Sequence, residues 1–396
     1  MSEETKKKTN SQPAEEKKTS TPKKIAIAVI AVTVGWMLLQ SYLFKPAMYN
    51  TRGDTMGTKY HVNVCAESSW GWERTAMAIE NELLRVNQMM STFIADSEIS
   101  QFNDNLSIDW VSVSPEMVKL VKLSKEASQM VDGKFDITVG PLVDLWGFGK
   151  KKKTLTAPPA PGDIAMAQLI SGLEKLEYQE NPPALKKAVP ELRIDLSGIA
   201  KGYGVDCVAA VLEKRGYSNY MIEIGGEART RGHKVVLQEK SGWRSFFSSE
   251  TKNLPWFIGV KQPIAEGLFE RPIITLRANL NDHSMATSGD VYNYKEIAGR
   301  RYAHIIDPTT GEAVQSLEHG TGIDGEEIGS VSVIAETCVQ ADALATGFFL
   351  LGIERGIAKA NANDLPIVYL IRTGESDAPI RFVMSEAYKK NYVQGQ

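Results

Sequence analysis

The sequence is poor in the residues from which several common kinds of site are built. It has three cysteines and five histidines in 396 residues, and no two cysteines have the CxxC spacing. This argues against a cysteine-based metal centre and against a disulfide-rich scaffold. No GxxxxGK[ST] segment occurs, which excludes a P-loop nucleotide site. The formal net charge is −3, so the chain also lacks the basic excess of a nucleic-acid-binding protein.

The three cysteines are Cys65, Cys207 and Cys338. An odd number leaves at least one thiol unpaired in an oxidising compartment. Cys207 and Cys338 lie in apolar helical segments, which predicts that they are buried packing residues. Whether one disulfide forms among the three stays open at this point.

The N-terminal 44 residues divide into a charged tail and an apolar run. Residues 1–24 contain seven lysines and four glutamates without hydrophobic periodicity, which is typical of a disordered tail. Residues 25–44, IAIAVIAVTVGWMLLQSYLF, carry no charge. As a helix this run would span roughly 30 Å, the thickness of the hydrocarbon core of a bilayer. The cationic tail predicts that the N-terminus stays inside and the remainder of the chain lies outside.

The alternative for the apolar run is a cleaved signal peptide. The run is longer than a usual signal core, and no clear small-x-small cleavage site follows it. Cys65 lies too far downstream to be a lipoprotein acylation site. We therefore predict an uncleaved single-pass anchor at 25–44 in the inner (cytoplasmic) membrane of a bacterium. The exported domain would then cover 46–396 and face the periplasm.

The exported part mixes strand and helix signals and therefore predicts an α+β chain. Gly57–Cys65 alternates like a strand, and residues 74–91 repeat apolar side chains at helical spacing. A second helix is predicted from the N-cap Ser114 onward, with Gly133 as its stop. Residues 229–256 fit neither pattern and are predicted to be an insertion that holds a hairpin.

The segment ETCVQADALATGFFLLG, residues 336–352, reads as a buried helix that contains a carboxylate. Thr337 opens a TCVQ capping box, and Gly352 is a suitable stop. Asp342 and Thr346 are i and i+4, so their oxygens project from one face. Such hard oxygens suit Mg²⁺. The alternative is structural: Asp342 bonds a nearby backbone group or arginine, and Thr346 bonds its own helix.

A second segment, residues 193–216, combines a short strand with a glycine-rich helix start. The strand would end at Asp195, and Ser197 would cap a helix with Gly198 in its first turn. Lys201 in that turn is unfavourable against the helix dipole, unless it faces a phosphate. The alternative is a glycine-rich packing turn without a ligand.

Two further groups of residues are candidates for ligand contacts. His304 lies in a strand-like RYAHII ahead of a turn. There it could act as a general base, donate a hydrogen bond to a phosphate, or have a structural role. Phe93, Phe135 and Trp146 lie beside loop glycines and aspartates. Such aromatic groups suit a flat aromatic ligand, or equally a loop packed onto a core.

Taken together, these segments resemble the ApbE family, the FAD:protein FMN transferases. Eight stretches occur in the family's order between Gly53 and about Gly352, which makes the resemblance specific, whereas the tail, the apolar run and the 229–256 insertion lie outside it. The stretches are GDTMGTKYHV, MSTFIADSEISQFN, DGKFDITVGPLVDLWGFG, IDLSGIAKGYGVD, IEIGGE, HSMATSGD, YAHIIDPTTG and AETCVQADALATGFFLLG.

The resemblance implies a bilobal, T-fold-related α+β domain that binds FAD between its lobes, with a divalent metal at the pyrophosphate. The metal would be Mg²⁺, with Mn²⁺ as the alternative. The family often has Tyr where Phe93 stands and Ala where Gly198 stands. The implied metal ligands are the Gly198 carbonyl, Asp342 and Thr346, and the implied FAD contacts are Met56, Phe93, Phe135, Asp136, Asp195, Lys201 and, by its backbone, Ile305.

The activity implied by the resemblance is transfer of FMN from FAD to a Thr or Ser hydroxyl of an acceptor flavoprotein, with release of AMP. His304 is our candidate for the group that accepts the hydroxyl proton. The implied acceptors belong to membrane redox complexes. Two alternatives stay open: an FAD pyrophosphatase that releases FMN and AMP, and a non-catalytic, membrane-tethered flavin-binding protein.

Overall fold

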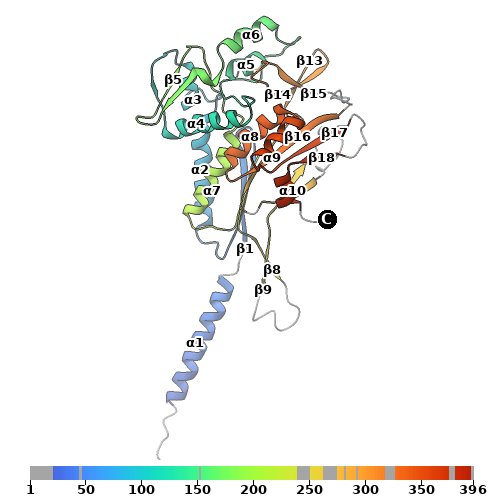
Figure 1. Ribbon diagram of the computed structural model, residues 1–396. Coiled ribbons are helices and arrows are strands. Elements are labelled where there is room, and N and C mark those ends of the chain that lie inside the picture. Colours follow the sequence, from blue (N-terminus) through green and yellow to red (C-terminus); the bar gives the residue numbers. More distant parts are fainter. Residues whose placement is uncertain are drawn as a thin grey trace, which may run out of the picture. The chain divides into compact units, whose positions relative to one another are not determined.

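The computed structural model describes residues 21–43, 47–150, 153–238, 250–261, 274–280, 282–290, 293–316, 326–373 and 380–393 (Figure 1). The chain divides into two units, Met1–Lys45 and Pro46–Gln396. In the first unit, helix α1 covers Thr21–Leu43, and its described side chains are exposed.

No helix within the described residues is long and apolar enough to cross a membrane. The side chains of 37–43, in the second half of the apolar run, lie outside the described part, as do residues 1–20 and 44–46. The anchor and the disordered tail therefore stay predictions from the sequence.

The second unit is built on an eight-stranded antiparallel sheet in the order β1-β2-β6-β7-β12-β16-β17-β18. Smaller sheets are β3-β5-β4, β13-β14-β15, β8-β9 and β10-β11. The strands are β1 Ala47–Thr55, β2 Thr58–Ala66, β3 Val111–Ser112, β4 Leu176–Gln179, β5 Ala184–Lys187, β6 Tyr220–Ile224, β7 Glu227–Arg231, β8 Lys234–Gln238, β9 Glu250–Leu254, β10 Phe257–Lys261, β11 Ile274–Asn279, β12 Ser284–Gly289, β13 Tyr294–Ile297, β14 Arg300–Ile306, β15 Ala313–Ser316, β16 Glu326–Ala335, β17 Ile367–Thr373 and β18 Arg381–Met384.

Helices cover the large sheet and connect it to the smaller ones. Helices α7 and α8 pack on β6, β7, β12 and β16, with α2 against α7 and α4 against α8 (Figure 1). The helices of this unit are α2 Trp72–Met90, α3 Glu98–Asp104, α4 Pro115–Met130, α5 Gly140–Leu145, α6 Pro161–Leu169, the 3₁₀ turn Leu173–Lys175, α7 Ala200–Lys214, α8 Cys338–Leu351, α9 Ile353–Ala362 and α10 Glu386–Tyr392.

Both faces of the large sheet are buried at its centre. In β17, Ile367, Tyr369 and Ile371 join the core under α8, whereas Val368 and Leu370 pack on the opposite face. Successive side chains of a strand point to opposite faces, so a strand covered on both sides becomes an apolar run. This is why IVYLI reads as one continuous hydrophobic segment.

Most of the local predictions from the sequence are confirmed. The α+β class is correct, β2 occupies the alternating segment, and α2 buries Ile79, Leu83 and Val86 as its periodicity requires. The Ser114 hydroxyl caps α4 by accepting from the N–H of Met117. All three cysteines are free. Within the proposed insertion, β8 and β9 form an antiparallel hairpin, and residues 239–249 between them lie outside the described part.

Two local predictions at helix starts are wrong. Helix α7 begins at Ala200, after N-cap Ile199, and Ser197 provides no cap. Ahead of it there is no regular strand: Arg193 makes only an isolated bridge to Val139. Helix α8 does begin after Thr337, but the Thr337 side chain makes no capping hydrogen bond. In both places tertiary contacts replace the expected local ones.

Candidate active site

The aspartate of α8, Asp342, lies where this helix packs against α7. Asp342 is 4% exposed, and its Oδ2 accepts a 2.9 Å hydrogen bond from the N–H of Gly202. A Cβ at Gly202 would lie 2.4 Å from the carbonyl oxygen of Cys338 and 2.8 Å from the Asp342 Cβ. Only glycine lets the two helices approach this closely, so Gly202 places the carboxylate against the first turn of α7.

The N-terminus of α8 is capped by a side chain from α7. The Asp206 carboxylate accepts from the N–H of Cys338 at 3.1 Å and of Val339 at 2.9 Å. Arg229 of β7 donates to the same carboxylate at 2.7 Å. Asp206 thus satisfies the helix start where a capping box was expected, and it fixes α8 relative to α7.

Burial makes the charge of Asp342 expensive. Burial raises its pKa above the ordinary value, while the Lys201 ammonium and the Gly202 N–H act in the opposite direction. Among the described residues, that N–H is the hydrogen-bond donor to this carboxylate. An additional cation beside Asp342 would relieve the remaining cost.

Two further predicted metal ligands approach each other near this carboxylate. Thr346 lies one turn along α8, and its Oγ1 is 3.1 Å from the Oγ of Ser288. A Cβ built on Gly198 would lie 3.7 Å from the same Oγ1. The segment before α7 and one face of α8 therefore bring Gly198, Asp342 and Thr346 to one end of the helix pair.

This donor set fits Mg²⁺. It offers one carboxylate, one hydroxyl and one carbonyl, all hard oxygens, and Mg²⁺ binds through few protein groups together with waters and substrate phosphates. In the described part of the chain, no cluster of three His, Cys, Asp or Glu residues could hold a metal by itself.

Lys201 lies beside these ligands and is paired with a buried glutamate. Its Nζ is 2.6 Å from Oε1 of Glu227, whose side chain is 1% exposed. Burial alone would lower the pKa of Lys201, but the Glu227 and Asp342 carboxylates outweigh it, and the pKa is raised. Burial raises the pKa of Glu227, against the effect of Lys201. Lys201 therefore keeps its positive charge at the start of α7.

The predicted flavin contacts surround the same helix start to different degrees. Met56 lies in the β1–β2 turn with φ 50°, and its Cε would be 2.8 Å from a Cβ on Gly204. Phe135 approaches Gly198 in the same way, at 3.0 Å. Phe93 is 57% exposed, so it lies at the surface.

The two predicted aspartates of the nucleotide-binding segments shape turns. Asp136 accepts from the N–H and hydroxyl of Thr138, both at 2.6 Å, and from the N–H of Leu173. Burial raises its pKa, and these hydrogen bonds oppose the rise. Asp195 accepts from the N–H of Ser197 at 2.8 Å. The carboxylate of Asp136 is thus occupied by its own turn, whereas one carboxylate oxygen of Asp195 accepts no hydrogen bond from the described residues.

His304 lies on β14 next to buried Ile305. Its backbone N–H donates to the carbonyl of Asn293 at 2.9 Å, and its Nδ1 is 3.1 Å from the same oxygen. His304 is exposed to solvent. Its pKa is lowered by desolvation and by the Lys201 ammonium, against the hydrogen bond to Asn293 and the carboxylates of Asp195 and Asp290. A neutral ring that donates from Nδ1 leaves Nε2 free to accept a proton.

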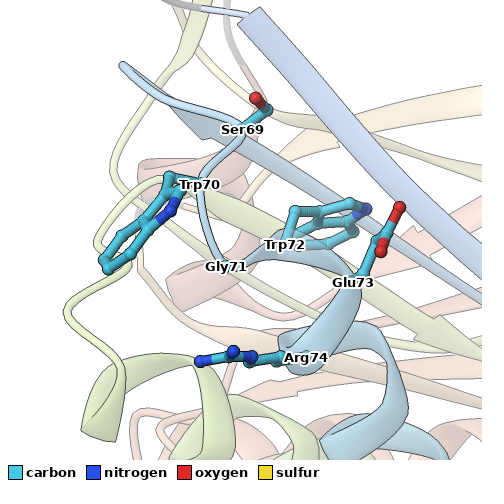
Figure 2. Close-up of a pocket in the computed structure, with 6 residues that line it drawn as sticks. All are labelled: Ser69, Trp70, Gly71, Trp72, Glu73 and Arg74. Atoms are coloured by element: carbon cyan, nitrogen blue, oxygen red, sulfur yellow. The ribbon is translucent and has the colours of Figure 1, made fainter.

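Two hollows of the described surface are lined by other residues. One, of about 400 Å³, lies on the β2–α2 loop between Trp70, Trp72 and Arg74 (Figure 2). The other, of about 1300 Å³, is lined by side chains that include Tyr302 and Phe349. Asp342 is placed at the start of α7 by the α7–α8 contact.

Comparison with known proteins agrees with this arrangement. The sequence matches the ApbE family over residues 56–369. The chain belongs to the ApbE family. It is 36% identical over 346 residues to the FAD:protein FMN transferase of Vibrio cholerae, covering 87% of this chain and 94% of that protein. It is 35% identical over 373 residues to the protein of the same name from Haemophilus influenzae, covering 93% and 98%.

Solved structures of ApbE proteins have the same fold. The flavin transferase ApbE from Vibrio cholerae superposes with a TM-score of 0.72 at 34% identity, over 88% of this chain and 100% of that one. The apo flavinyl transferase ApbE of Pseudomonas stutzeri gives 0.71 at 28% identity, over 89% and 99%. The predicted ApbE-like fold is thus confirmed.

Two residues that matter to the site were missed by sequence reasoning. Asp206 gives no local signal, because it caps a helix more than 130 positions away. Glu227 gives a weak one: it ends the IEIGGE stretch directly after two glycines, where a strand begins.

Proposed function

We propose that this ApbE protein transfers FMN from FAD to a Thr or Ser hydroxyl of an acceptor flavoprotein and releases AMP. The observation that carries the proposal is the meeting of Asp342, Thr346 and Lys201 at the start of α7. One carboxylate, one hydroxyl and one ammonium at a helix N-terminus suit a metal-bound pyrophosphate. The names of the curated relatives support the same activity.

The side chains would act by positioning and by neutralising charge, which is what phosphoryl transfer chiefly requires. Mg²⁺, held by the Gly198 carbonyl, Asp342 and Thr346, would supply Lewis-acid stabilisation of the phosphate oxygens. Lys201 and the N-terminal N–H groups of α7 would bind the same phosphates. Met56 and Phe135, which flank this helix start, would contact the flavin nucleotide between the two lobes of the domain.

His304 would receive the proton of the attacking hydroxyl at Nε2. The acceptor oxygen forms a bond to the phosphorus of the FMN moiety, and the bond from that phosphorus to the AMP oxygen breaks. Because the pKa of His304 is lowered, the ring is neutral and ready to act as a base at neutral pH.

The proposed setting is the bacterial inner membrane. The uncharged run 25–44 and the lysine-rich tail before it support a single-pass anchor with the catalytic domain on the periplasmic side. Acceptors would then be flavoproteins of membrane redox complexes. In spheroplasts, external protease should digest the domain from residue 46 onward, and alkaline carbonate should leave the full chain in the membrane. Digestion only after lysis would contradict this orientation.

The activity is tested with the full-length chain in detergent, FAD, Mg²⁺ and a candidate acceptor domain. Flavin fluorescence that stays on the acceptor after denaturation and electrophoresis establishes transfer. Free FMN and AMP without a labelled acceptor would instead identify an FAD pyrophosphatase. FAD binding without either product would identify a flavin-binding protein.

A further inference from the structure

Helix α7 and strand β7 are joined by three ion pairs in a row. The partners on β7 are two residues apart and therefore share one face of the strand. Their partners on α7 are spread along the helix from its first turn to its last. The pairs are Lys201–Glu227 at 2.6 Å, Asp206–Arg229 at 2.7 Å and Glu213–Arg231 at 2.6 Å.

The carboxylates of the three pairs become more buried along the row. Glu213, at the far end of α7, is 34% exposed, Asp206 is 18% exposed, and Glu227, at the end where the predicted ligand residues meet, is 1% exposed. The basic partners do not follow this order, since Lys201 is still 30% exposed. A buried carboxylate depends on its partner far more than an exposed one. Of the three carboxylates, the one beside the candidate active site is therefore the one that most needs its cation.

The buried Glu227 carboxylate costs more free energy than a residue that only attaches β7 to α7 would need to. Its Oε1 accepts from Lys201, but Oε2 is buried and has no hydrogen-bond partner among the described residues. A buried carboxylate oxygen without a donor costs free energy. Asp206, in the next pair, receives donors from two backbone N–H groups and from Arg229. Glu227 thus directs its charge at Lys201 rather than at the backbone.

The Lys201 side chain is held both at its stem and at its ammonium. Its stem runs beside the β6–β7 turn, where a Cβ on Gly225 would lie 3.2 Å from the Lys201 Cδ. Gly225 has φ 60°, which favours glycine. A lysine ammonium is a point charge on a flexible chain, and here Glu227 fixes it by an ion pair of 2.6 Å, while the Asp342 carboxylate also raises its pKa.

We propose that Glu227 is a positioning residue: it holds the Lys201 ammonium at the start of α7, in the place where the pyrophosphate of FAD binds. Glu227 itself need not touch the ligand. The proposal rests on the proposed function for the identity of the ligand, and it adds a residue that acts through Lys201.

The test is a double-mutant cycle in the full-length protein with Lys201→Ala, Glu227→Ala and both changes together. Binding of FAD is measured by quenching of flavin fluorescence, with and without Mg²⁺, and transfer is measured as kcat and KM for FAD. We expect Glu227→Ala to lower kcat/KM about 100-fold, the effect of a misplaced group. The double variant should be no slower than Lys201→Ala alone, within about twofold.

The matched control is Glu213→Ala, which breaks an ion pair between the same helix and strand far from the ligand residues. It should leave FAD binding and transfer unchanged. Glu227→Gln keeps an acceptor for Lys201 without the charge and should fall between wild type and Glu227→Ala. Thermal unfolding of every variant shows whether it is folded, and Glu227→Gln keeps the test valid if Glu227→Ala is not.

Two results would overturn the proposal. One is a double variant whose loss equals the product of the two single losses, because independent residues give additive free energies. The other is Glu227→Ala or Glu227→Gln with wild-type binding of FAD. A protein that binds FAD with coupled effects of Lys201 and Glu227, yet transfers no FMN, would contradict the proposed function and leave the positioning role intact.

Discussion

Two lysines, the fully buried Lys187 and the half-buried Lys201, are held in the fold in opposite ways. Lys187 on β5 is fully buried, and its Nζ donates to the carbonyls of Asn103 at 3.2 Å and Asn105 at 2.7 Å. It also lies 4.8 Å from the centre of the Phe102 ring. In the described part of the chain it has no carboxylate partner. Burial lowers the pKa of Lys187 to about 8.

Lys201 is half-buried beside carboxylates, and its pKa is raised. The two environments have opposite effects on the pKa of a lysine. The carbonyl oxygens at the end of α3 bind the Lys187 ammonium and so attach this loop to β5. They do not fully offset the desolvation of the ammonium, so the pKa of Lys187 is lowered. Carboxylates preserve the charge, so Lys201 can attract an anion. The first lysine is a structural residue, and the second belongs to the proposed FAD-binding site.

The largest effect should come from the carboxylate beside Lys201. Asp342→Ala should lower metal-dependent FMN transfer by about a thousandfold or more, because it removes the charged metal ligand. Its stability should be unchanged or increased, since a costly buried charge disappears. Transfer rates at saturating Mg²⁺ and thermal unfolding measure the two effects. Undiminished transfer would rule out the metal assignment.

A variant at His304 tests whether this residue is the general base and whether its lowered pKa sets the pH dependence of the rate. His304→Asn should reduce the transfer rate about 100-fold, the usual contribution of a general base. In wild type, the rate should fall as the pH drops below the lowered pKa of His304, because protonation blocks Nε2. The rate is measured from pH 5 to 8. A His304→Asn variant with the full rate across that range would remove His304 as the base.

Exchanging each lysine for methionine should separate the two roles. Lys201→Met should weaken FAD binding about 30-fold, since one charged phosphate contact is worth about 2 kcal/mol. Lys187→Met should leave FAD binding intact and lower the free energy of unfolding by about 2 to 4 kcal/mol, because buried carbonyls lose their donor. Urea unfolding and FAD titration are the measurements. The comparison fails if both variants lose binding equally.

The difference in stability between wild type and Lys187→Met should depend on pH, because it reports the titration of Lys187. Its pKa falls from 10.5 in the unfolded chain to about 8 in the fold, so the unfolded state binds more protons between these values. Wild type should therefore gain stability relative to Lys187→Met as the pH rises from 8 toward 10.5, by up to about 3 kcal/mol. Urea unfolding of both proteins at pH 7, 8, 9 and 10 gives this difference. A constant difference would contradict the pKa shift.

The structure brings Asp342, Thr346 and Lys201 close to one end of α7, but not with the backbone that the sequence predicted there. The i, i+4 pairing of Asp342 and Thr346 and the first-turn position of Lys201 follow from helical spacing, which is a local property. Ser197 does not cap the helix, because α7 begins at Ala200 and its N-cap is Ile199. Short capping signals compete with tertiary contacts, and at both α7 and α8 the tertiary contacts prevailed.

By itself, the sequence determined the α+β class, the strands with buried alternation and the types of side chain that are proposed to bind a phosphate. Those features depend on periodicity and on the chemistry of single residues. Only the tertiary structure decided that Asp206 caps α8, that Gly202 admits Asp342 and that Glu227 holds Lys201. Each of these contacts joins residues 26 to 140 positions apart, and no local pattern records which distant group will satisfy a buried charge.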